Sequence, residues 1–397
     1  MYRLLSIALI AFALCACSNT NDGGTPSGGT VDVSNDFTPR GAQTAGYRVV
    51  QHQELQIKVW YPAQGDAAAP IDYSVALKFP GFPPDPVVIH GTAALDAPVA
   101  EGGPYPLVVL SHGFGLNPEW YHALAEHLAS HGFVVLAPEH TEADWFEDVL
   151  VATANRPVEV SAVIDFAELP AQRSWIDAER VAVLGHSYGG YTALAAAGAR
   201  LDPASLAARC EGVDDPMMSS YFCDSFLSNE ATLAENMGLD EVPGGLWPSM
   251  ADARVDTIVS IAGDAYLFGE EGLSSVSVPV MFIGGTADTG TPWSWGSQLS
   301  FEHVASDERA LVGLEGAEHM IATARCEDMP FTASMPDEYA GYFCQDPAWE
   351  KSRAHDVIHH LTTAWLKHTL DQHGEALEAL DPARFADDET LSVSLGQ

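Results

Sequence analysis

Apolar and polar positions alternate early in the chain and later give way to continuous apolar runs. At Leu55, Ile57 and Val59 the apolar side chains recur with the period of two that is typical of a β-strand. Together with residues 47–50, this segment predicts an antiparallel hairpin over residues 47–61 at the start of a sheet. Residues 81–106 are rich in Pro and Gly, so we expect a long loop there.

A series of short apolar runs begins at residue 107, and each run is typical of a strand that is buried on both faces. Helical patterns lie between them, including an amphipathic segment over 119–132, and we expect a last long helix over 349–370. This alternation predicts an α/β fold with a mostly parallel central sheet and helices on both faces. The predicted strands are residues 107–110, 133–137, 181–184, 257–261, 278–283 and 310–314.

Residues 200–253 are longer than an ordinary connection between two such elements, so we interpret them as an inserted cap. The methionine and aromatic side chains of this segment could line an acyl-binding pocket or form a small satellite core. The sequence favours neither interpretation for Met217, Met218, Tyr221, Phe222, Phe226, Met237 and Trp247.

The run V-A-V-L-G-H-S-Y-G-G at residues 181–190 predicts a strand that turns sharply into a helix, with Ser187 at the turn. Glycines flank this serine on both sides, which lets the backbone double back without side-chain collisions. The pattern is typical of a nucleophile elbow, in which the serine hydroxyl is presented at the end of the sheet. Ser187 is therefore the candidate nucleophile.

A serine hydroxyl is a weak nucleophile and requires a base that is itself oriented by an acid. Asp288 follows the predicted strand 278–283 in the run G-G-T-A-D-T-G-T-P, and His319 follows the strand 310–314 in G-A-E-H. Ligand sites of open parallel sheets lie at this carboxyl end of the strands. We therefore expect Asp288 and His319 to complete a triad with Ser187, in the chain order Ser, Asp, His.

Two amide donors are needed for the oxyanion that forms when the serine attacks a carbonyl. The amide of Tyr188, directly after the serine, is one candidate. The second is the amide of Phe114 in the run S-H-G-F-G at residues 111–115, which follows another predicted strand. We interpret His112 in the same run as a residue that braces the loop.

These segments resemble the dienelactone-hydrolase-related and platelet-activating-factor-acetylhydrolase-like bacterial branch of the α/β-hydrolases. The resemblance rests on residues 106–140, on R-P-V-E-V at 156–160, on the elbow, and on the segments with Asp288 and His319, and it covers roughly residues 40–370. It implies an α/β-hydrolase fold and ester hydrolysis without a cofactor. Dienelactone hydrolases proper have a cysteine nucleophile, so Ser187 favours ester over enol-lactone substrates.

The resemblance leaves one alternative for the triad acid. Acetylhydrolase-like proteins can take it from an earlier strand end, which here corresponds to Asp264 in S-I-A-G-D-A. We favour Asp288 because the context G-x-x-D-x-x-x-P around it is complete.

The expected function is a serine carboxylic-ester hydrolase acting on small or lipid-like esters. Polyester hydrolases related to cutinases share the same order of segments and are the first alternative. An amidase or peptidase with the same triad is a further alternative, as is a non-catalytic surface binding module on a hydrolase fold.

The N-terminus predicts export. A basic start is followed by an apolar run over residues 4–14, which is too short to span a bilayer and typical of a signal peptide over 1–16. The junction L-C-A-C resembles a bacterial lipoprotein box, which implies a lipid-modified Cys17 and delivery to the outer membrane or cell surface. Residues 17–37 then form a flexible linker, and 38–397 form the catalytic domain.

Four further cysteines remain after Cys15 and Cys17, and an even number in an exported chain favours disulfides. Three pairings are possible, and we favour Cys210 with Cys223 and Cys326 with Cys344 because each closes a short local loop. The chain has no C-x-x-C or H-E-x-x-H spacing, so we expect no metal site.

Charge narrows the choice of partners. The formal net charge of −38 at pH 7 argues against nucleic acid and against anionic lipid, leaving the N-terminal lipid as the expected membrane contact. The charge fits an enzyme in salt-rich water or a compositional habit of the lineage, and we expect a monomer that acts on an ester substrate. Hydrophobic residues make up 47% of the 397 residues, which is ample for one large core.

Overall fold

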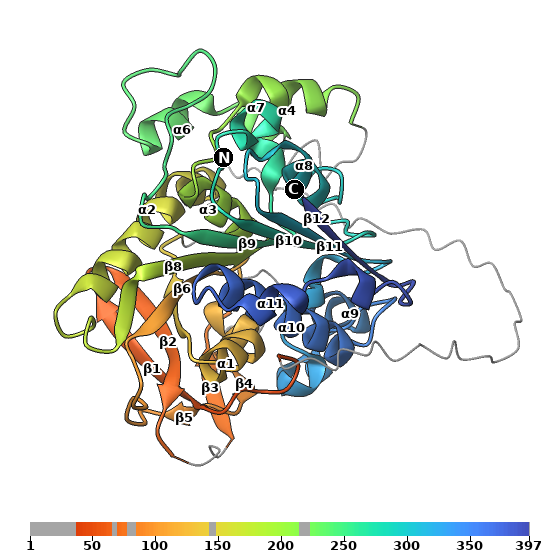
Figure 1. Ribbon diagram of the computed structural model, residues 1–397. Coiled ribbons are helices and arrows are strands. Elements are labelled where there is room, and N and C mark those ends of the chain that lie inside the picture. The colour runs from red at the N-terminus through yellow and green to blue at the C-terminus, as the bar shows by residue number, and fades with distance from the viewer. Residues whose placement is uncertain (1–36, 66–69, 78–84, 143–147, 214–222, 397) are drawn as a thin grey trace, which may run out of the picture.

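The computed structural model describes residues 37–65, 70–77, 85–142, 148–213 and 223–396. Its centre is a ten-stranded sheet in the order β12-β11-β10-β9-β8-β6-β7-β2-β1-β5 (Figure 1). The parallel part runs from β7 to β11, and the antiparallel strands β1, β2 and β12 flank it. The predicted mostly parallel sheet is confirmed.

The strands of the parallel part coincide closely with the predicted apolar runs. They are β6 (Tyr105–Ser111), β7 (Val134–Glu139), β8 (Ile176–His186), β9 (Thr257–Ile261), β10 (Val280–Gly285) and β11 (Arg309–Leu314). The predicted hairpin is β1 (Thr44–His52) paired with β2 (Leu55–Ala63). Because β6 precedes both of its neighbours in the chain, the connections reverse direction at β6, which is the switch point where open α/β sheets bind ligands.

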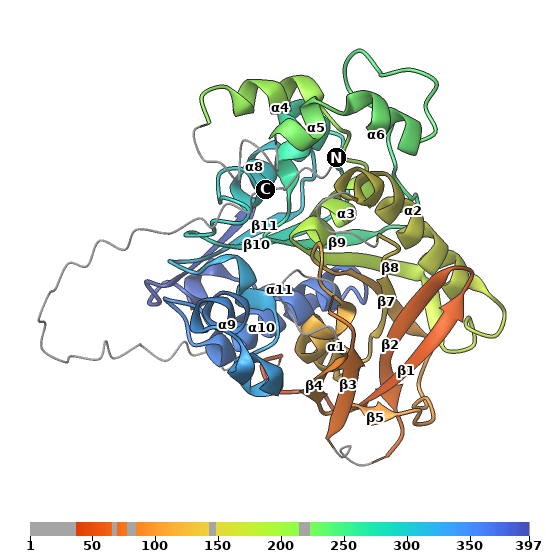
Figure 2. The same cartoon turned by 180° about the vertical axis from the view of Figure 1, so that it is seen from behind.

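Helices cover both faces of the sheet, as the two opposite views show (Figures 1 and 2). One face carries α1 (His122–Ser130), α10 (Lys351–Thr369) and α11 (Gly374–Glu378). The other carries α2 (Val149–Glu168), α3 (Tyr188–Ala196) and α8 (Ser297–His303). The expected last long helix is α10.

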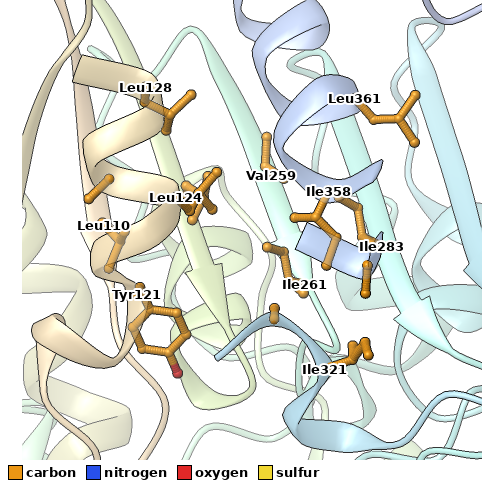
Figure 3. Close-up of a cluster of buried hydrophobic side chains, with 14 of the residues drawn as sticks. Leu110, Tyr121, Leu124, Leu128, Val259, Ile261, Ile283, Ile321, Ile358 and Leu361 are labelled. Carbon is orange, nitrogen blue, oxygen red and sulfur yellow. The ribbon is translucent and has the colours of Figure 1, made fainter. Parts of the chain in front are cut away.

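A buried apolar cluster fills the space between the sheet and each helical layer. Figure 3 shows part of one cluster, where Leu124 and Leu128 of α1 and Ile358 and Leu361 of α10 lie over Val259 of β9. Each buried side chain of this size contributes roughly 1.5–3 kcal/mol relative to an exposed one. The two clusters hold the sheet rigid, so the loops at its carboxyl edge have a fixed base.

The expectation of a long loop over residues 81–106 is wrong at residues 87–91 and 94–95. Residues Val87–Gly91 form β4, which pairs with β3 (Ile71–Val75) in a separate two-stranded sheet, and Ala94–Leu95 form β5. Val87 and Ile89 point inward in strand alternation, a pattern that the surrounding Pro and Gly obscured. Figure 2 shows this hairpin beside α1, where Tyr73 donates a 2.7 Å hydrogen bond to Glu126.

The strand at the C-terminus, β12 (Leu391–Gly396), was not predicted. It pairs antiparallel with β11 and forms the edge of the sheet. Leu391 and Val393 are buried and alternate with exposed serines, so a period of two was present in the sequence.

The segment 200–253 contains α4 (Pro203–Cys210), α5 (Ser225–Leu227) and α6 (Glu230–Asn236). Phe226 and Trp247 are buried against Leu206 and Leu233 of the same segment, around a void of only about 20 Å³. Both side chains belong to the large buried cluster on the α2 and α3 face of the sheet, and Met237 packs against it, so these three residues form neither an acyl pocket nor a separate satellite core. Met217, Met218, Tyr221 and Phe222 lie outside the described residues.

The described residues contain two disulfides, Cys210–Cys223 and Cys326–Cys344, which is the pairing that the sequence favoured. The second closes a segment that contains α9 (Asp337–Cys344) and the 3-10 turns Cys326–Asp328 and Pro330–Ser334, and the turn His319–Ala322 lies just before this segment. A disulfide that closes a loop of this length contributes roughly 3 kcal/mol to the free energy of unfolding. Among the described helices, none combines the length and apolar character needed to cross a membrane.

Candidate active site

Ser187 occupies a strained turn between β8 and α3. Its φ and ψ angles are 56° and −122°, a region that side chains other than glycine rarely adopt. The turn is held by a 2.9 Å hydrogen bond from the Ser187 amide to the carbonyl of Ile261 in β9. Gly189 is required here, because a Cβ at this position would lie 1.9 Å from the carbonyl oxygen of Ser111.

The structure joins Ser187, His319 and Asp288 in one chain of hydrogen bonds. His319 Nε2 lies 2.8 Å from Ser187 Oγ, and His319 Nδ1 lies 2.8 Å from Asp288 Oδ2. Because Nδ1 faces a carboxylate, it carries the proton, and Nε2 is left as the acceptor for the serine hydroxyl. The imidazole is 6% exposed, so it is shielded from bulk water but reachable.

The Asp288 carboxylate is itself fixed by its own loop. Its Oδ1 accepts hydrogen bonds from the amides of Gly290 (2.8 Å) and Thr291 (2.7 Å). Gly290 also makes room for the imidazole of His319, because a Cβ at residue 290 would lie 2.6 Å from Cγ of His319. The run G-T-A-D-T-G-T therefore orients the acid and admits the imidazole in one turn.

Asp264, the alternative acid, lies in the same site with a different partner. It follows β9 and is 3% exposed, and its Oδ1 accepts a 2.5 Å hydrogen bond from the Thr291 hydroxyl. Burial raises the pKa of Asp264 to about 6. The histidine partner is thus Asp288, and Asp264 buttresses the neighbouring loop.

The charges around His319 set its protonation. Burial alone would lower the pKa of this imidazole, but the negative charge and hydrogen bond of Asp288 outweigh burial, and Asp264 acts in the same direction. The net result is a pKa of His319 above its ordinary value.

The loop after β6 faces the elbow. Tyr188 is the first residue of α3, where amide groups have no partner inside the helix. Phe114 packs its ring 5.4 Å from the ring of Tyr188, which brings the two residues expected to donate amides side by side. His112 braces this loop, as expected, since its Nδ1 donates to the Gly113 carbonyl (2.8 Å) and its Nε2 accepts from the His140 amide (3.3 Å).

His186 links this loop to the loop of the base. Its Nε2 donates a 2.8 Å hydrogen bond to the carbonyl of His319, and its Nδ1 lies 2.8 Å from the Tyr121 hydroxyl. The Tyr121 hydroxyl in turn accepts from the amide of Gly113 (3.0 Å). Burial lowers the pKa of His186 well below its ordinary value, so it acts as a neutral connector.

Sequence reasoning gave no role to a buried ionic network behind the loop. Arg156 of α2 is fully buried and binds Glu142, while His140 Nδ1 lies 2.6 Å from Glu159 and His140 Nε2 lies 2.8 Å from Ser111 Oγ. A signal was available, because Arg156 lies on the apolar stripe of its helix with Ala152 and Val160 one turn away on either side.

His140, Glu142 and Glu159 offer ligand atoms within 4.8 Å of one another, a spacing that could suit a metal ion. The guanidinium of Arg156 already donates to Glu142 from Nε at 3.0 Å and from a second nitrogen. Arg156 thereby compensates the charge of Glu142, while Glu159 is already bound to His140 and Thr141, so these residues do not fit a metal.

A polar cavity of about 600 Å³ lies on the β7 side of the loop that follows β6. Asn117, His140 and Thr141 form one part of its lining, and Lys58, Glu119 and Glu139 form another. Lys58 Nζ lies 3.1 Å from Glu119 and 3.6 Å from Glu139, so its charge is compensated.

Comparisons with known proteins agree with this architecture. A family model described as Chlorophyllase matches residues 74–214. The platelet-activating factor acetylhydrolase of Canis lupus familiaris is 25% identical over 248 residues, which are 48% of this chain and 54% of that protein. Chlorophyllase-1 of Arabidopsis thaliana is 30% identical over 165 residues, which are 36% of this chain and 50% of that protein.

Among solved structures, a ferulic acid esterase from Streptomyces cinnamoneus aligns with a TM-score of 0.57 and 20% identity. The alignment covers 90% of this chain and 98% of that one, which confirms the α/β-hydrolase fold. The chain spans about half the length of the curated relatives that it matches. The expected resemblance to acetylhydrolases is confirmed, and the similarity to chlorophyllases was not foreseen.

Proposed function

We propose that this chain, an α/β-hydrolase of the esterase type, is a serine carboxylic-ester hydrolase that acts on small or lipid-like esters through Ser187, His319 and Asp288. The observation that carries the proposal is the chain of 2.8 Å contacts from the Ser187 hydroxyl through His319 to Asp288, at the end of a strained elbow. The named relatives support it, because each is an acetylhydrolase, a chlorophyllase or an esterase.

In the proposed mechanism, His319 Nε2 takes the proton of Ser187 as its oxygen attacks the ester carbonyl. Asp288 holds Nδ1–H toward itself, so the imidazole keeps the tautomer that can accept this proton. The amides of Phe114 and Tyr188 are proposed to stabilise the oxyanion. His319 then protonates the departing alcohol, and water repeats the sequence on the acyl-enzyme. These residues perform each proton transfer without a cofactor.

The electrostatics of the site support this cycle. The carboxylate of Asp288 stabilises the imidazolium that forms when His319 takes the serine proton, which is the same interaction that raises the pKa of His319. The base therefore gains basicity from its partner while burial excludes bulk water from the reacting atoms.

A series of p-nitrophenyl esters of increasing acyl length tests the proposal. We expect the native protein to hydrolyse short members of the series, and we expect Ser187→Ala and His319→Ala to reduce the rate to background. A polyester film assayed in parallel separates the polymer alternative, because only a polymer hydrolase would release soluble monomer from it. A folded native protein that hydrolyses no ester in the series would refute the proposal.

We also propose that the enzyme is exported and held at the outer membrane or cell surface through lipidated Cys17, as a monomer. The apolar start of the chain and the cysteine-containing junction support this location, as do the two disulfides. In a bacterial host, the native protein should fractionate with membranes and Cys17→Ser should appear in the soluble fraction. Membrane association of Cys17→Ser would refute lipid anchoring.

A further inference from the structure

Arg156 lies directly behind the loop that follows β6. Its side chain is fully buried, and one terminal nitrogen donates a 2.6 Å hydrogen bond to the carbonyl of His112. Nε and the other terminal nitrogen donate to Glu142, which is also buried. Three nitrogens of one guanidinium are therefore committed, and the plane of the group is fixed.

The same guanidinium contacts both residues whose amides are proposed to bind the oxyanion. Its central carbon lies 5.7 Å from the ring centroid of Phe114 and 5.5 Å from that of Tyr188, within the range of cation–π attraction. The hydroxyl of Tyr188 is also hydrogen bonded to Thr153, one turn before Arg156 on α2. The two candidate amide donors come from separate segments of the chain, and the side chain of Arg156 contacts both residues.

We propose that Arg156 is a positioning residue that sets the separation and direction of the amides of Phe114 and Tyr188. The inference rests on the proposed esterase function, because the two amides need to point at the same position only if an oxyanion forms there. Arginine suits this role because its planar guanidinium can donate hydrogen bonds in its plane while aromatic rings pack against its faces. The ammonium group of lysine has no such plane. Glu142 compensates the charge, so the contribution of Arg156 is geometric.

The chemical consequence is confined to the transition state. The two amides bind the oxyanion of the transition state more strongly than the ester carbonyl of the ground state. Displacing the amides should therefore lower kcat and leave KM nearly unchanged. Loss of one oxyanion donor costs about 100- to 1000-fold in rate. We expect the loss of kcat in Arg156→Met to lie within this range or somewhat below it.

The test compares substrates with a trifluoromethyl ketone of the same acyl length, which forms a tetrahedral oxyanion with the serine. For Arg156→Met and Arg156→Lys, the inhibition constant of the ketone should rise by the same factor by which kcat/KM falls, with KM changed by less than about threefold. Arg254→Met is the matched control. Arg254 pairs with Asp252 just before β9 and with Asp165 and Glu168 in the last turn of α2, so it also ties α2 to the core but at the end of the helix remote from Arg156. Its loss should alter Tm without altering either constant.

The outcomes separate the two proposals. If the native protein neither hydrolyses esters nor binds the ketone, the proposed function fails. If the native protein is active and the folded Arg156 variants keep native kcat/KM and ketone affinity, the positioning role is refuted. A rise in KM at unchanged kcat would also refute it, because it would assign Arg156 to substrate binding. If Arg156→Met does not fold, Arg156→Lys decides, since it retains a cation opposite Glu142.

Discussion

The hydroxyl of Thr291 donates a 2.5 Å hydrogen bond to Asp264, while the amide of the same threonine donates to Asp288. One residue thereby connects the two acids that compete for the role of histidine partner. His319 Nδ1 lies 2.8 Å from Asp288, so the two carboxyls have different tasks in the site.

Replacement of each acid by asparagine separates these tasks. Asp288→Asn should lower kcat by roughly 10⁴-fold, because the amide no longer holds the imidazole in the tautomer that accepts the serine proton. Asp264→Asn should keep kcat within about tenfold of native, since an amide oxygen can still accept from Thr291. Steady-state kinetics on one p-nitrophenyl ester is sufficient. Abolished turnover in Asp264→Asn together with near-native turnover in Asp288→Asn would reverse the assignment.

In the proposed mechanism, the dependence of kcat/KM on pH reports the protonation of His319 in the free enzyme. Only neutral His319 can act as the base, and its pKa is raised, so activity should rise with pH through a midpoint above the ordinary histidine value of about 6.5. Asp264→Asn should move that midpoint to lower pH, because the Asp264 charge helps to raise the pKa of His319. A midpoint below the ordinary value in the native protein would contradict these electrostatics.

A stack of histidine rings between α1 and α10 predicts sensitivity of the fold to acid. The His127 and His359 rings are stacked with centroids 4.7 Å apart, and His355 lies 5.4 Å from His359. Burial lowers the pKa of both His127 and His355 to about 3. From about pH 6.5 down to about 3 the unfolded chain therefore binds more protons than the folded one, and stability should fall with pH.

Denaturant unfolding between pH 7 and 4 measures this effect. In His127→Gln, the unfolded chain should bind up to one proton fewer relative to the folded chain. The slope of the unfolding free energy against pH should therefore be smaller by up to about 1.4 kcal/mol per pH unit. The exposed His373 gives the control, since His373→Gln should leave the slope unchanged. An unchanged slope in His127→Gln would refute the assignment of acid sensitivity to this stack.

Pro157 and Tyr191 are predicted to be energetically coupled. Proline has no N–H, so Pro157 cannot donate to the carbonyl of Thr153 four residues earlier in α2, and the Tyr191 hydroxyl donates to that carbonyl at 2.9 Å. Tyr191→Phe should lower the unfolding free energy by about 1–2 kcal/mol in the native background. The loss should be smaller in Pro157→Ala, where the alanine amide can replace the hydroxyl. Equal losses in a double-mutant cycle would show that the two residues act independently.

The strand pattern predicted which candidate residues would lie close together. Ser187, Asp288 and His319 each follow an apolar run that forms a strand, so their meeting at one edge of the sheet followed from the strand pattern. The choice between Asp264 and Asp288 could not follow from that pattern, because both acids come directly after strands. Contacts between loops decide it, above all the close approach of Gly290 to the ring of His319.

The contacts of Arg156 with Phe114 and Tyr188 could not be predicted from the strand pattern for a similar reason. Arg156 is distant in sequence from both Phe114 and Tyr188, and only the packing of α2 on the elbow brings the three together. The β4 and β12 strands had alternating patterns that were readable, but neighbouring Pro, Gly and acidic residues obscured them. Local signals therefore located the candidate reacting groups, and tertiary packing supplied the contacts that orient them.

Covalent labelling tests the central claim most directly. A fluorophosphonate reacts with a serine only where a base activates it and donors stabilise the developing oxyanion. Intact mass and peptide mapping of the treated native protein should show one adduct per chain, located on Ser187, and Ser187→Ala should show none. A folded native protein that stays unlabelled, or that carries the adduct on another residue, would contradict the account.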